Sequence, residues 1–370
     1  MKVVLACSFP RDEKLGSART PLRLEPELAR LGVEVVSLFA EDLPAGPRGR
    51  AAELSAPFRM AWAVEQRAAG ADIVDIAGGD GFAYFRYARV RRPRQALVAR
   101  SNGLWDLALA GEDHGLKSPL KRAASRVYQE QVLCRWEQSA IRAADVAVFL
   151  SRCDADEVVR RRWKTRDGVG AVNPGVDAFF ADDAPLEGRK DVAFVGTFFH
   201  RKGSDVASRV MSELMRERPE LGLTLFGSGT SPEAARAHFD ESVRSRVHVE
   251  PPLSARELAA RLQHFAVFLF PTRYEGFGIV TTEAMARGLA VVTTPTGAGA
   301  DIVRDGENGF IVPVGAVPEA KSAVARLLDD DALRVRLARA GRAAATALTW
   351  GRAAEQLVLL YERALSRRRH

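Results

Sequence analysis

The residues best suited to do chemistry lie in one stretch, residues 268–294, which reads FLFPTRYEGFGIVTTEAMARGLAVVTT. It contains two glutamates, Glu275 and Glu283, with seven residues between them and a Gly-Phe-Gly turn directly after the first. Glycines at a helix start leave backbone N–H groups accessible at the positive end of the helix dipole, which favours an anion such as phosphate. Carboxylates accept hydrogen bonds from hydroxyl groups. The pattern therefore predicts a site for a sugar nucleotide, which has phosphate in its middle and hydroxyl-rich groups at both ends.

The elements that position these residues follow from the same stretch. The apolar run Phe268–Phe270 predicts a buried strand that ends at Pro271, and residues 279–287 have the composition of a helix. Gly288 predicts a left-handed cap before a second strand over residues 289–293. The alternative interpretation is an ordinary strand-to-helix turn with glutamates on the surface.

This stretch resembles the retaining glycosyltransferases of family 4, which have the GT-B fold, because EGFG opens the glutamate pair and EAMARG closes it. The resemblance implies that Glu275 faces the donor sugar and that Glu283 holds the ribose. It also implies that the turn and helix start contact the donor diphosphate. The residues of this donor-binding turn are Gly276, Phe277, Gly278 and Ile279.

A second family-like motif follows the apolar run 192–195. The family usually shows Gly-Arg, a short gap and Lys-Gly, in which both cations neutralise the donor diphosphate. Here Gly196 and Lys202 fit the pattern, but Thr197 stands where the arginine would be. The resemblance assigns Lys202 to leaving-group stabilisation, with Arg201 or His200 as the substitute cation. The alternative is a surface lysine that opens a helix.

Two further positions resemble nucleotide contacts of the family. Gly227 follows the apolar run 223–226, and Leu253 follows the run 247–252. Neither residue identifies the base.

The first half of the chain matches the family only in outline. Gly16 and Ser17 occupy the small-residue loop that borders the acceptor and donor cleft, with a plain connecting turn as the alternative. Asn102 stands where many members have a histidine that contacts the donor sugar. An asparagine retains hydrogen-bonding capacity but cannot carry a proton charge.

Alternating strand and helix patterns predict an α/β protein with two Rossmann-like, doubly wound domains facing a cleft. Residues 1–186 form the expected acceptor-binding domain and residues 187–350 the nucleotide-sugar-binding domain. By resemblance, residues 351–370 form a C-terminal helix that crosses back to the first domain. The length of 370 residues also favours two domains.

Composition and charge limit the classes of binding partner and the cellular compartment. The net charge is +7 and arginines cluster at residues 89–94, 160–162 and 367–369, without a nucleic-acid-binding motif. A solvated surface is the preferred interpretation of these clusters, and attraction to anionic substrates or membrane phospholipids is the alternative. Three cysteines without disulfide or metal spacing, no apolar run of membrane-spanning length and no signal-peptide pattern predict a cytoplasmic protein.

We therefore expect a retaining transfer of a hexose-type sugar from a nucleoside-diphosphate sugar to a hydroxyl acceptor. No metal or cofactor is expected, since cationic side chains and a helix start supply the electrostatic stabilisation. Two alternatives stay open at this point. One is a sugar-nucleotide epimerase or hydrolase on the same fold, and the other is a sugar-nucleotide-binding protein without catalysis.

Overall fold

The computed structural model describes residues 1–13, 15–47, 49–109, 128–181 and 184–369. Contacts divide these residues into two compact units. The first unit comprises residues 1–109, 128–175 and 350–369, and the second comprises residues 176–349. The second unit therefore begins after Gly175, earlier than the expected boundary at residue 186. The reason is that Val176 and Phe180 are buried in the apolar core of the second unit.

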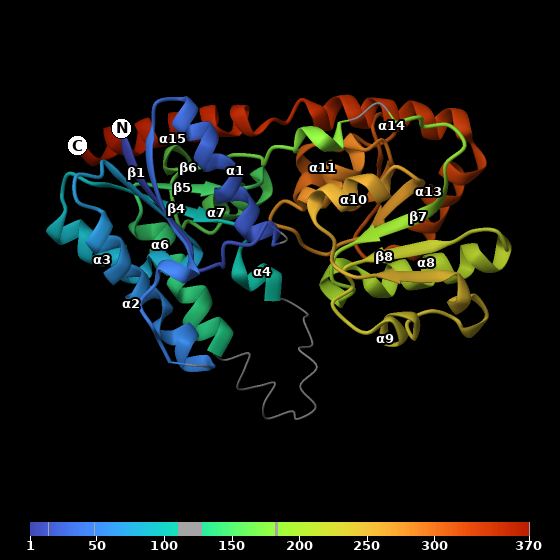
Figure 1. The fold of residues 1–370 in the computed structure, drawn as a ribbon, viewed down its shortest axis with the longest axis horizontal. Helices are drawn as coiled ribbons and strands as arrows, with labels where there is room; N and C mark the ends of the chain where they lie inside the picture. The colour runs from blue at the N-terminus through green and yellow to red at the C-terminus, as the bar shows by residue number, and fades with distance from the viewer. Residues whose placement is uncertain (14, 48, 110–127, 182–183, 370) are drawn as a thin grey trace. The chain divides into compact units, whose positions relative to one another are not determined.

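Within the described residues, the first unit contains a six-stranded parallel sheet (Figure 1). Its order is β2-β1-β3-β4-β5-β6. The strands are β1 (Lys2–Ala6), β2 (Glu34–Leu38), β3 (Ile73–Ala77), β4 (Ala96–Ser101), β5 (Val146–Phe149) and β6 (Val169–Ala171). The sequence analysis missed β6, which is only three residues long and contains Gly170.

Helices connect these strands. They are α1 (Gly16–Arg30), α2 (Arg50–Arg67), α3 (Gly81–Arg91), α4 (Trp105–Leu109), α6 (Cys134–Ala143), α7 (Arg152–Arg160) and α15 (Trp350–Arg369). A π-helical segment at Gln129–Leu133 leads into α6. The amphipathic pattern of residues 120–144 predicts one long helix here, and the part of it before residue 128 lies outside the described residues.

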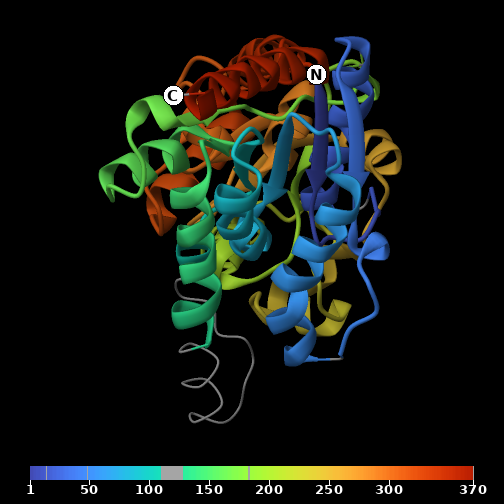
Figure 2. The ribbon, with the colours of Figure 1, turned by 90° about the vertical axis from the view of Figure 1, so that its left-hand side faces the viewer.

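Helix α15 packs with the first unit although it follows the second unit in sequence. Its apolar side chains, including Trp350, Leu357 and Tyr361, belong to the same buried cluster as Val98 of β4 and Val148 of β5. The C-terminal part of α15 and the start of β1 lie at the same end of this unit in both views (Figures 1 and 2). The C-terminal helix was therefore correctly expected to return to the first domain, and it begins at Trp350.

The second unit has a six-stranded parallel sheet of order β12-β11-β10-β7-β8-β9 among its described residues. The strands are β7 (Lys190–Val195), β8 (Leu223–Phe226), β9 (Val247–Glu250), β10 (Phe265–Phe270), β11 (Ala290–Thr293) and β12 (Phe310–Ile311). The helices are α8 (Ser204–Glu217), α9 (Pro232–Arg236), α10 (Ala255–Leu262), α11 (Ile279–Ala286), α12 (Ala298–Asp301), α13 (Val317–Asp329) and α14 (Asp331–Thr346).

Burial on both faces explains the apolar runs from which the strands were predicted. Every residue of β10, Phe-Ala-Val-Phe-Leu-Phe, is buried. Parallel sheets covered by helices on both faces have such continuous apolar strands. The predicted α/β class with two doubly wound domains is confirmed.

Three consecutive aspartates, residues 329–331, are a pattern typical of a solvated turn and helix cap, and they lie where α13 ends and α14 begins. The side chain of Asp330 accepts a hydrogen bond from the Leu333 backbone N–H over 2.8 Å and so caps α14. Across the described residues, no helix is long and apolar enough to cross a membrane.

Candidate functional site

A cluster of charged side chains lies at the carboxyl ends of two neighbouring strands, β7 and β10. Lys202, in the short 3₁₀ turn His200–Lys202, places its Nζ atom 2.5 Å from Oε1 of Glu275. An Nη1 atom of Arg201 lies 3.7 Å from the same carboxylate oxygen. The side chains of Glu275 and Lys202 are only 9% and 16% exposed. The structure thus brings together three of the residues singled out as catalytic.

Thr272 fixes the carboxylate of Glu275 from the other side. The Thr272 hydroxyl lies 3.1 Å from Glu275 Oε1, and Thr272 is buried. Below the cation, the ring of Phe270 lies 5.2 Å from Lys202 Nζ, a distance at which the aromatic face attracts the ammonium group. Glu275 Oε1 is therefore held between an ammonium group and a hydroxyl group.

The turn that carries Lys202 is clamped to the loop after β10. The Arg273 backbone N–H donates to the Arg201 carbonyl over 2.7 Å. The Arg273 guanidinium donates to both oxygens of Asp205, at 2.7 and 2.8 Å. Such two-pronged pairs fix orientation as well as distance. Asp205 opens α8, so this pair sets the position of Lys202 relative to Glu275.

Gly203 permits the close approach of these two loops. Its φ is +78°, and a Cβ atom at this position would lie 2.1 Å from the carbonyl oxygen of Pro271. A side chain at residue 203 would therefore push apart the turn with Lys202 and the loop with Glu275.

The expected glycine turn and helix start are present at α11. Gly278 has φ +80° and precedes Ile279, the first helical residue. A Cβ atom on Gly278 would lie 3.2 Å from Cγ of Glu275, so glycine allows this side chain to lie against the helix start. Glu283 lies in the second turn of α11 and is 2% exposed. The first N–H groups of any helix have no partner within the helix, which leaves this end suited to an anion.

The other predicted donor-side residues also lie at carboxyl ends of strands in the second unit. Gly196 follows β7, and its N–H donates to Phe226 O over 2.8 Å. Gly227 follows β8, and its N–H donates to Glu250 O over 3.0 Å. Thr197 is half-buried directly after Gly196, and Leu253 is half-buried after β9. In parallel α/β sheets, ligands bind at this edge.

The structure distinguishes the two cations proposed to replace the missing arginine. His200 Nδ1 lies 3.5 Å from Asp205 Oδ1, on a half-exposed side chain. Arg201 instead points its guanidinium toward Glu275 and the carbonyl of Tyr274, which lies 3.3 Å from its Nη1 atom. Arg201 is therefore the better placed of the two.

In the first unit, Asn102 follows the carboxyl end of β4. Its Oδ1 atom is buried and has no hydrogen-bond partner among the described residues. Glu137 of α6 holds the adjacent backbone in place, since it accepts from Ser101 Oγ over 3.0 Å and from the Trp105 N–H over 2.9 Å. Burial raises the pKa of Glu137 to about 8. Asn102 is thus presented on a rigid turn with an unsatisfied acceptor.

Gly16 and Ser17 do not lie in a loop, contrary to the sequence-based expectation. They are the first two residues of α1, which runs through Pro21 and Pro26. Proline in a helix costs about 3 kcal/mol, but burial of apolar residues such as Leu24 and Leu28 offsets this cost. Both residues still lie on the connection that leaves the carboxyl end of β1.

The sequence analysis missed three residues that shape these surroundings: Thr272, Asp205 and Glu137. Thr272 directly follows a buried strand, a position where parallel sheets bind ligands, and this signal could have identified it. No local pattern links Asp205 to Arg273 or Glu137 to Ser101, because these partners are 68 and 36 residues apart.

Comparison with known proteins decides the family. Residues 176–344 match the family described as Glycosyl transferases group 1. A D-inositol 3-phosphate glycosyltransferase from Xylanimonas cellulosilytica is 31% identical over 289 residues, which cover 71% of this chain and 68% of that protein. The chain belongs to the group 1 glycosyl transferases. It is therefore an enzyme that transfers a sugar from a nucleoside-diphosphate sugar.

Solved structures support the fold of this glycosyltransferase. Sucrose-phosphate synthase from Thermosynechococcus elongatus superposes with a TM-score of 0.77 at 19% identity and covers 99% of this chain and 100% of its own. HepE from Anabaena, solved in complex with UDP, has a TM-score of 0.70 at 14% identity and covers 97% and 99% of the two chains. Within the glycosyltransferase, Lys202, Glu275 and Glu283 fall inside the region that matches the family, whereas Asn102 lies outside it.

Proposed function

We propose that this enzyme is a retaining, metal-independent glycosyltransferase that moves a hexose-type sugar to a hydroxyl acceptor. The observation that carries this proposal is the contact of Lys202 with Glu275 beside the N-terminus of α11. It combines a carboxylate suited to sugar hydroxyls with a cation and a helix start suited to phosphate.

In the proposed reaction, the bond between the anomeric carbon and the diphosphate oxygen breaks while the acceptor oxygen bonds to the same face of the sugar. The acceptor proton passes to the departing diphosphate oxygen. Lys202, Arg201 and the N–H groups of residues 276–278 stabilise the negative charge that develops on the leaving group. Glu275 orients the sugar by accepting its hydroxyl groups and forms no covalent bond to it, and Glu283 holds the ribose.

Asn102 is proposed to donate to and accept from the donor sugar. Its buried Oδ1 atom has no hydrogen-bond partner among the residues that the structure describes, and a buried unsatisfied acceptor is costly unless a ligand group satisfies it. Gly16 and Ser17, at the start of α1, are proposed to border the acceptor. Gly196, Thr197, Gly227 and Leu253 are proposed to surround the nucleotide.

The relatives suggest which substrates to test first. HepE was solved with UDP, so UDP-sugars are the first donors, followed by GDP-sugars. The Xylanimonas relative is named for D-inositol 3-phosphate, so a phosphorylated cyclitol is the first acceptor. Cell-surface glycans, glycolipids and natural products are the wider acceptor classes.

The test has two stages. A thermal-shift screen against free nucleoside diphosphates and sugar nucleotides identifies the donor, because a ligand at a hundred times its Kd adds about 2.7 kcal/mol of stability. The glycoside formed from that donor is then examined by NMR in the presence and absence of EDTA. An α-linked product from an α-linked donor, formed equally with EDTA, is expected. An inverted product would overturn the retaining mechanism, and epimerised or hydrolysed donor without any glycoside would favour the epimerase or hydrolase alternative.

A further inference from the structure

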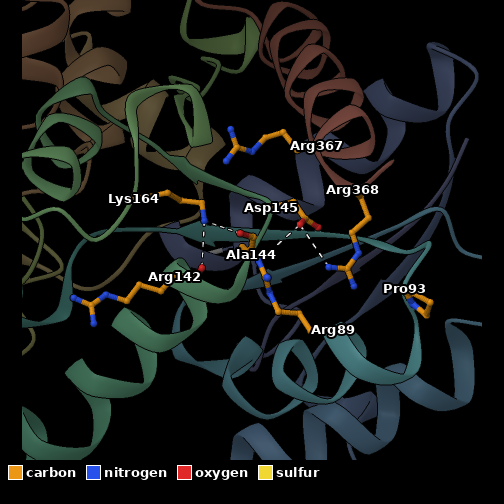
Figure 3. Close-up of a pocket in the computed structure, with 8 residues that line it drawn as sticks. All are labelled: Arg89, Pro93, Arg142, Ala144, Asp145, Lys164, Arg367 and Arg368. Atoms are coloured by element: carbon orange, nitrogen blue, oxygen red, sulfur yellow. Dashed lines mark hydrogen bonds and ion pairs between the residues drawn. The ribbon is translucent and has the colours of Figure 1, made fainter. Parts of the chain in front are cut away.

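A second positively charged site lies in the first unit, away from the residues assigned to the donor. A cavity of about 470 Å³ is bounded by the ends of α3 and α6, the residue before β5, the loop after α7 and the last turn of α15 (Figure 3). The lining residues are Arg89, Pro93, Arg142, Ala144, Asp145, Lys164, Arg367 and Arg368. We call this cavity the basic pocket.

The basic pocket lies at the amino-terminal edge of the sheet. Asp145 directly precedes β5 and accepts the N–H of Leu97, near the start of β4, over 2.8 Å. Asn102 follows the opposite end of β4. At about 3.3 Å per residue, Leu97 and Asn102 are about 16 Å apart along the strand. The basic pocket and Asn102 therefore lie at opposite ends of the sheet and belong to different sites.

Positive charge in this pocket exceeds negative charge. Five cationic side chains line it, against the single carboxylate of Asp145. That carboxylate lies 3.9 Å from Arg89 Nη2 and 3.7 Å from Arg368 Nη1, which are longer distances than hydrogen-bonded ion pairs have. Asp167, which is not one of the lining residues, forms an ion pair with Arg367. Two carboxylates thus face five cations.

Helix capping accounts for part of this arrangement. Arg89 Nε donates to Ala143 O over 2.6 Å, and Lys164 Nζ donates to Ala144 O over 2.6 Å. Cations are favourable at helix C-termini, so these contacts position the side chains. Arg368 also caps a helix, because its Nη2 atom donates to Ala88 O and Arg92 O at the C-terminus of α3, both over 3.3 Å. Capping does not satisfy its Nε atom, which is buried without a hydrogen-bond partner among the described residues on a side chain only 10% exposed.

The pKa of Lys164 reflects the excess of positive charge around it. Burial, together with the charges of Arg367 and Arg89, lowers its pKa to about 8. A buried guanidinium with an unsatisfied N–H and an ammonium group destabilised by like charges both gain from an anion in the cavity. The volume lies within the range of roughly 300–1,000 Å³ typical of small-ligand sites, which exceeds the needs of a single inorganic ion.

We propose that the basic pocket binds a phosphate-bearing anion, independently of the donor site. The guanidinium groups of Arg89 and Arg368 and the ammonium group of Lys164 come from separate segments and lie around Asp145 and Ala144 (Figure 3). Such groups recognise phosphate oxygens. A soluble organic phosphate and the headgroup of an anionic phospholipid share this chemistry. The sequence predicted that the arginine clusters form a solvated surface. Arg91 and Arg94 are exposed, as this predicts, but the side chain of Arg368 is only 10% exposed.

Two binding arms test the proposal and separate the two sources of phosphate. Inorganic pyrophosphate is titrated calorimetrically into Lys202→Ala protein, a background chosen to weaken pyrophosphate binding at the proposed donor site. Sedimentation with phosphatidylcholine vesicles, with and without phosphatidylglycerol, measures lipid binding. The test variant is Arg89→Gln with Arg367→Gln, and the matched control is Arg91→Gln with Arg94→Gln, which removes the same two charges from exposed positions outside the lining.

We expect the test variant to weaken binding about tenfold or more in at least one arm, because two charge-assisted contacts are lost, and the control with Arg91→Gln and Arg94→Gln to have little effect. Loss in the pyrophosphate arm identifies a soluble phosphate, and loss confined to phosphatidylglycerol vesicles identifies a headgroup. The proposal is wrong if protein with an intact basic pocket binds in neither arm, or if the substitutions leave binding unchanged. Arg367→Gln alone, on an exposed residue of the last turn of α15, provides the same comparison if the test variant fails to fold.

Discussion

Lys202 Nζ and Glu275 Oε1 lie 2.5 Å apart although 73 residues separate them in the chain. The contact joins the turn after β7 to the loop after β10, and Arg273 with Asp205 holds those two segments together. The carboxylate assigned to the sugar and the cation assigned to the diphosphate are therefore adjacent before any substrate binds. Such preorganisation is what makes electrostatic stabilisation of a leaving group effective.

Lys202→Ala should lower turnover of the donor by about a hundredfold or more, since it removes a positive charge from the leaving group. The measurement is the steady-state rate with the donor found by thermal shift. The control is Lys190→Ala, which removes an exposed lysine from the first residue of β7, the strand that precedes the turn with Lys202. This substitution should leave the rate unchanged. A folded Lys202→Ala enzyme with a near-normal rate would refute the role of Lys202.

Glu283→Ala should weaken UDP binding but leave pyrophosphate binding nearly unchanged. The reason is that Glu283 is assigned to the ribose hydroxyl groups, which pyrophosphate lacks. Calorimetric titration of both ligands into the wild-type enzyme and the variant measures the difference. Equal losses for the two ligands would show that Glu283 acts on the fold of α11 and not on the ribose.

Gly203→Ala should destabilise the second unit by more than the approximately 1–2 kcal/mol that a left-handed conformation costs an alanine. The added Cβ atom meets the Pro271 carbonyl in addition. Gly306→Ala is the matched control, because Gly306 has φ +73° and open space around its Cβ position. Urea denaturation of both variants should show the larger loss for Gly203→Ala, and equal losses would mean that the close approach to Pro271 is unimportant.

Tyr361→Phe should destabilise the first unit by about 1–3 kcal/mol, because a buried carboxylate loses a hydrogen-bond donor. The Tyr361 hydroxyl on α15 donates to Asp75 Oδ2 on β3 over 2.8 Å, and Arg100 Nε donates to the other oxygen over 3.1 Å. Burial raises the pKa of Asp75. Tyr87→Phe removes an exposed hydroxyl that contacts Glu65 and should cost far less. Denaturant unfolding compares the two, and similar losses would contradict this account.

Glu137 should make the stability of the enzyme depend on pH between about 4.5 and 8. Its pKa rises from 4.5 to about 8 in the folded state, so the folded chain binds more protons than the unfolded chain in this window. The free energy of unfolding therefore falls as pH rises through the window. Glu137→Gln removes the titrating group and should reduce this slope.

Glu157→Gln is the control for that measurement. Hydrogen bonds from Arg160 and Arg161 lower the pKa of Glu157 to about 2, so this carboxylate stays ionised in both states well above pH 5. Its replacement should shift stability by a constant amount between pH 5.5 and pH 8, where wild-type and Glu157→Gln slopes should match. If the free energy of unfolding of Glu137→Gln depended on pH as steeply as that of the wild type, Glu137 would not be the source of the pH dependence.

The sequence alone predicted the unit from β10 to β11. A continuous apolar strand, Gly278 before the helix and Gly288 after it are local signals, and each is decided by the conformational preferences of nearby residues. The glutamate spacing and the resemblance that it carries are also local. For the same reason, almost every other strand could be placed from its apolar run, and the three-residue strand β6 could not.

Only the tertiary structure decided which distant residues meet. Arg201 lies 3.7 Å from the Glu275 carboxylate, whereas its sequence neighbour His200 lies 3.5 Å from Asp205. The region from Val176 joins the second unit because its side chains are buried there, while Trp350 returns to the first. Because α15 packs with the first unit, its arginines lie beside those of α3 in the basic pocket. Local sequence sets the conformational preference of each segment. Burial and long-range contacts depend instead on which segments, far apart in the sequence, the folded chain brings together.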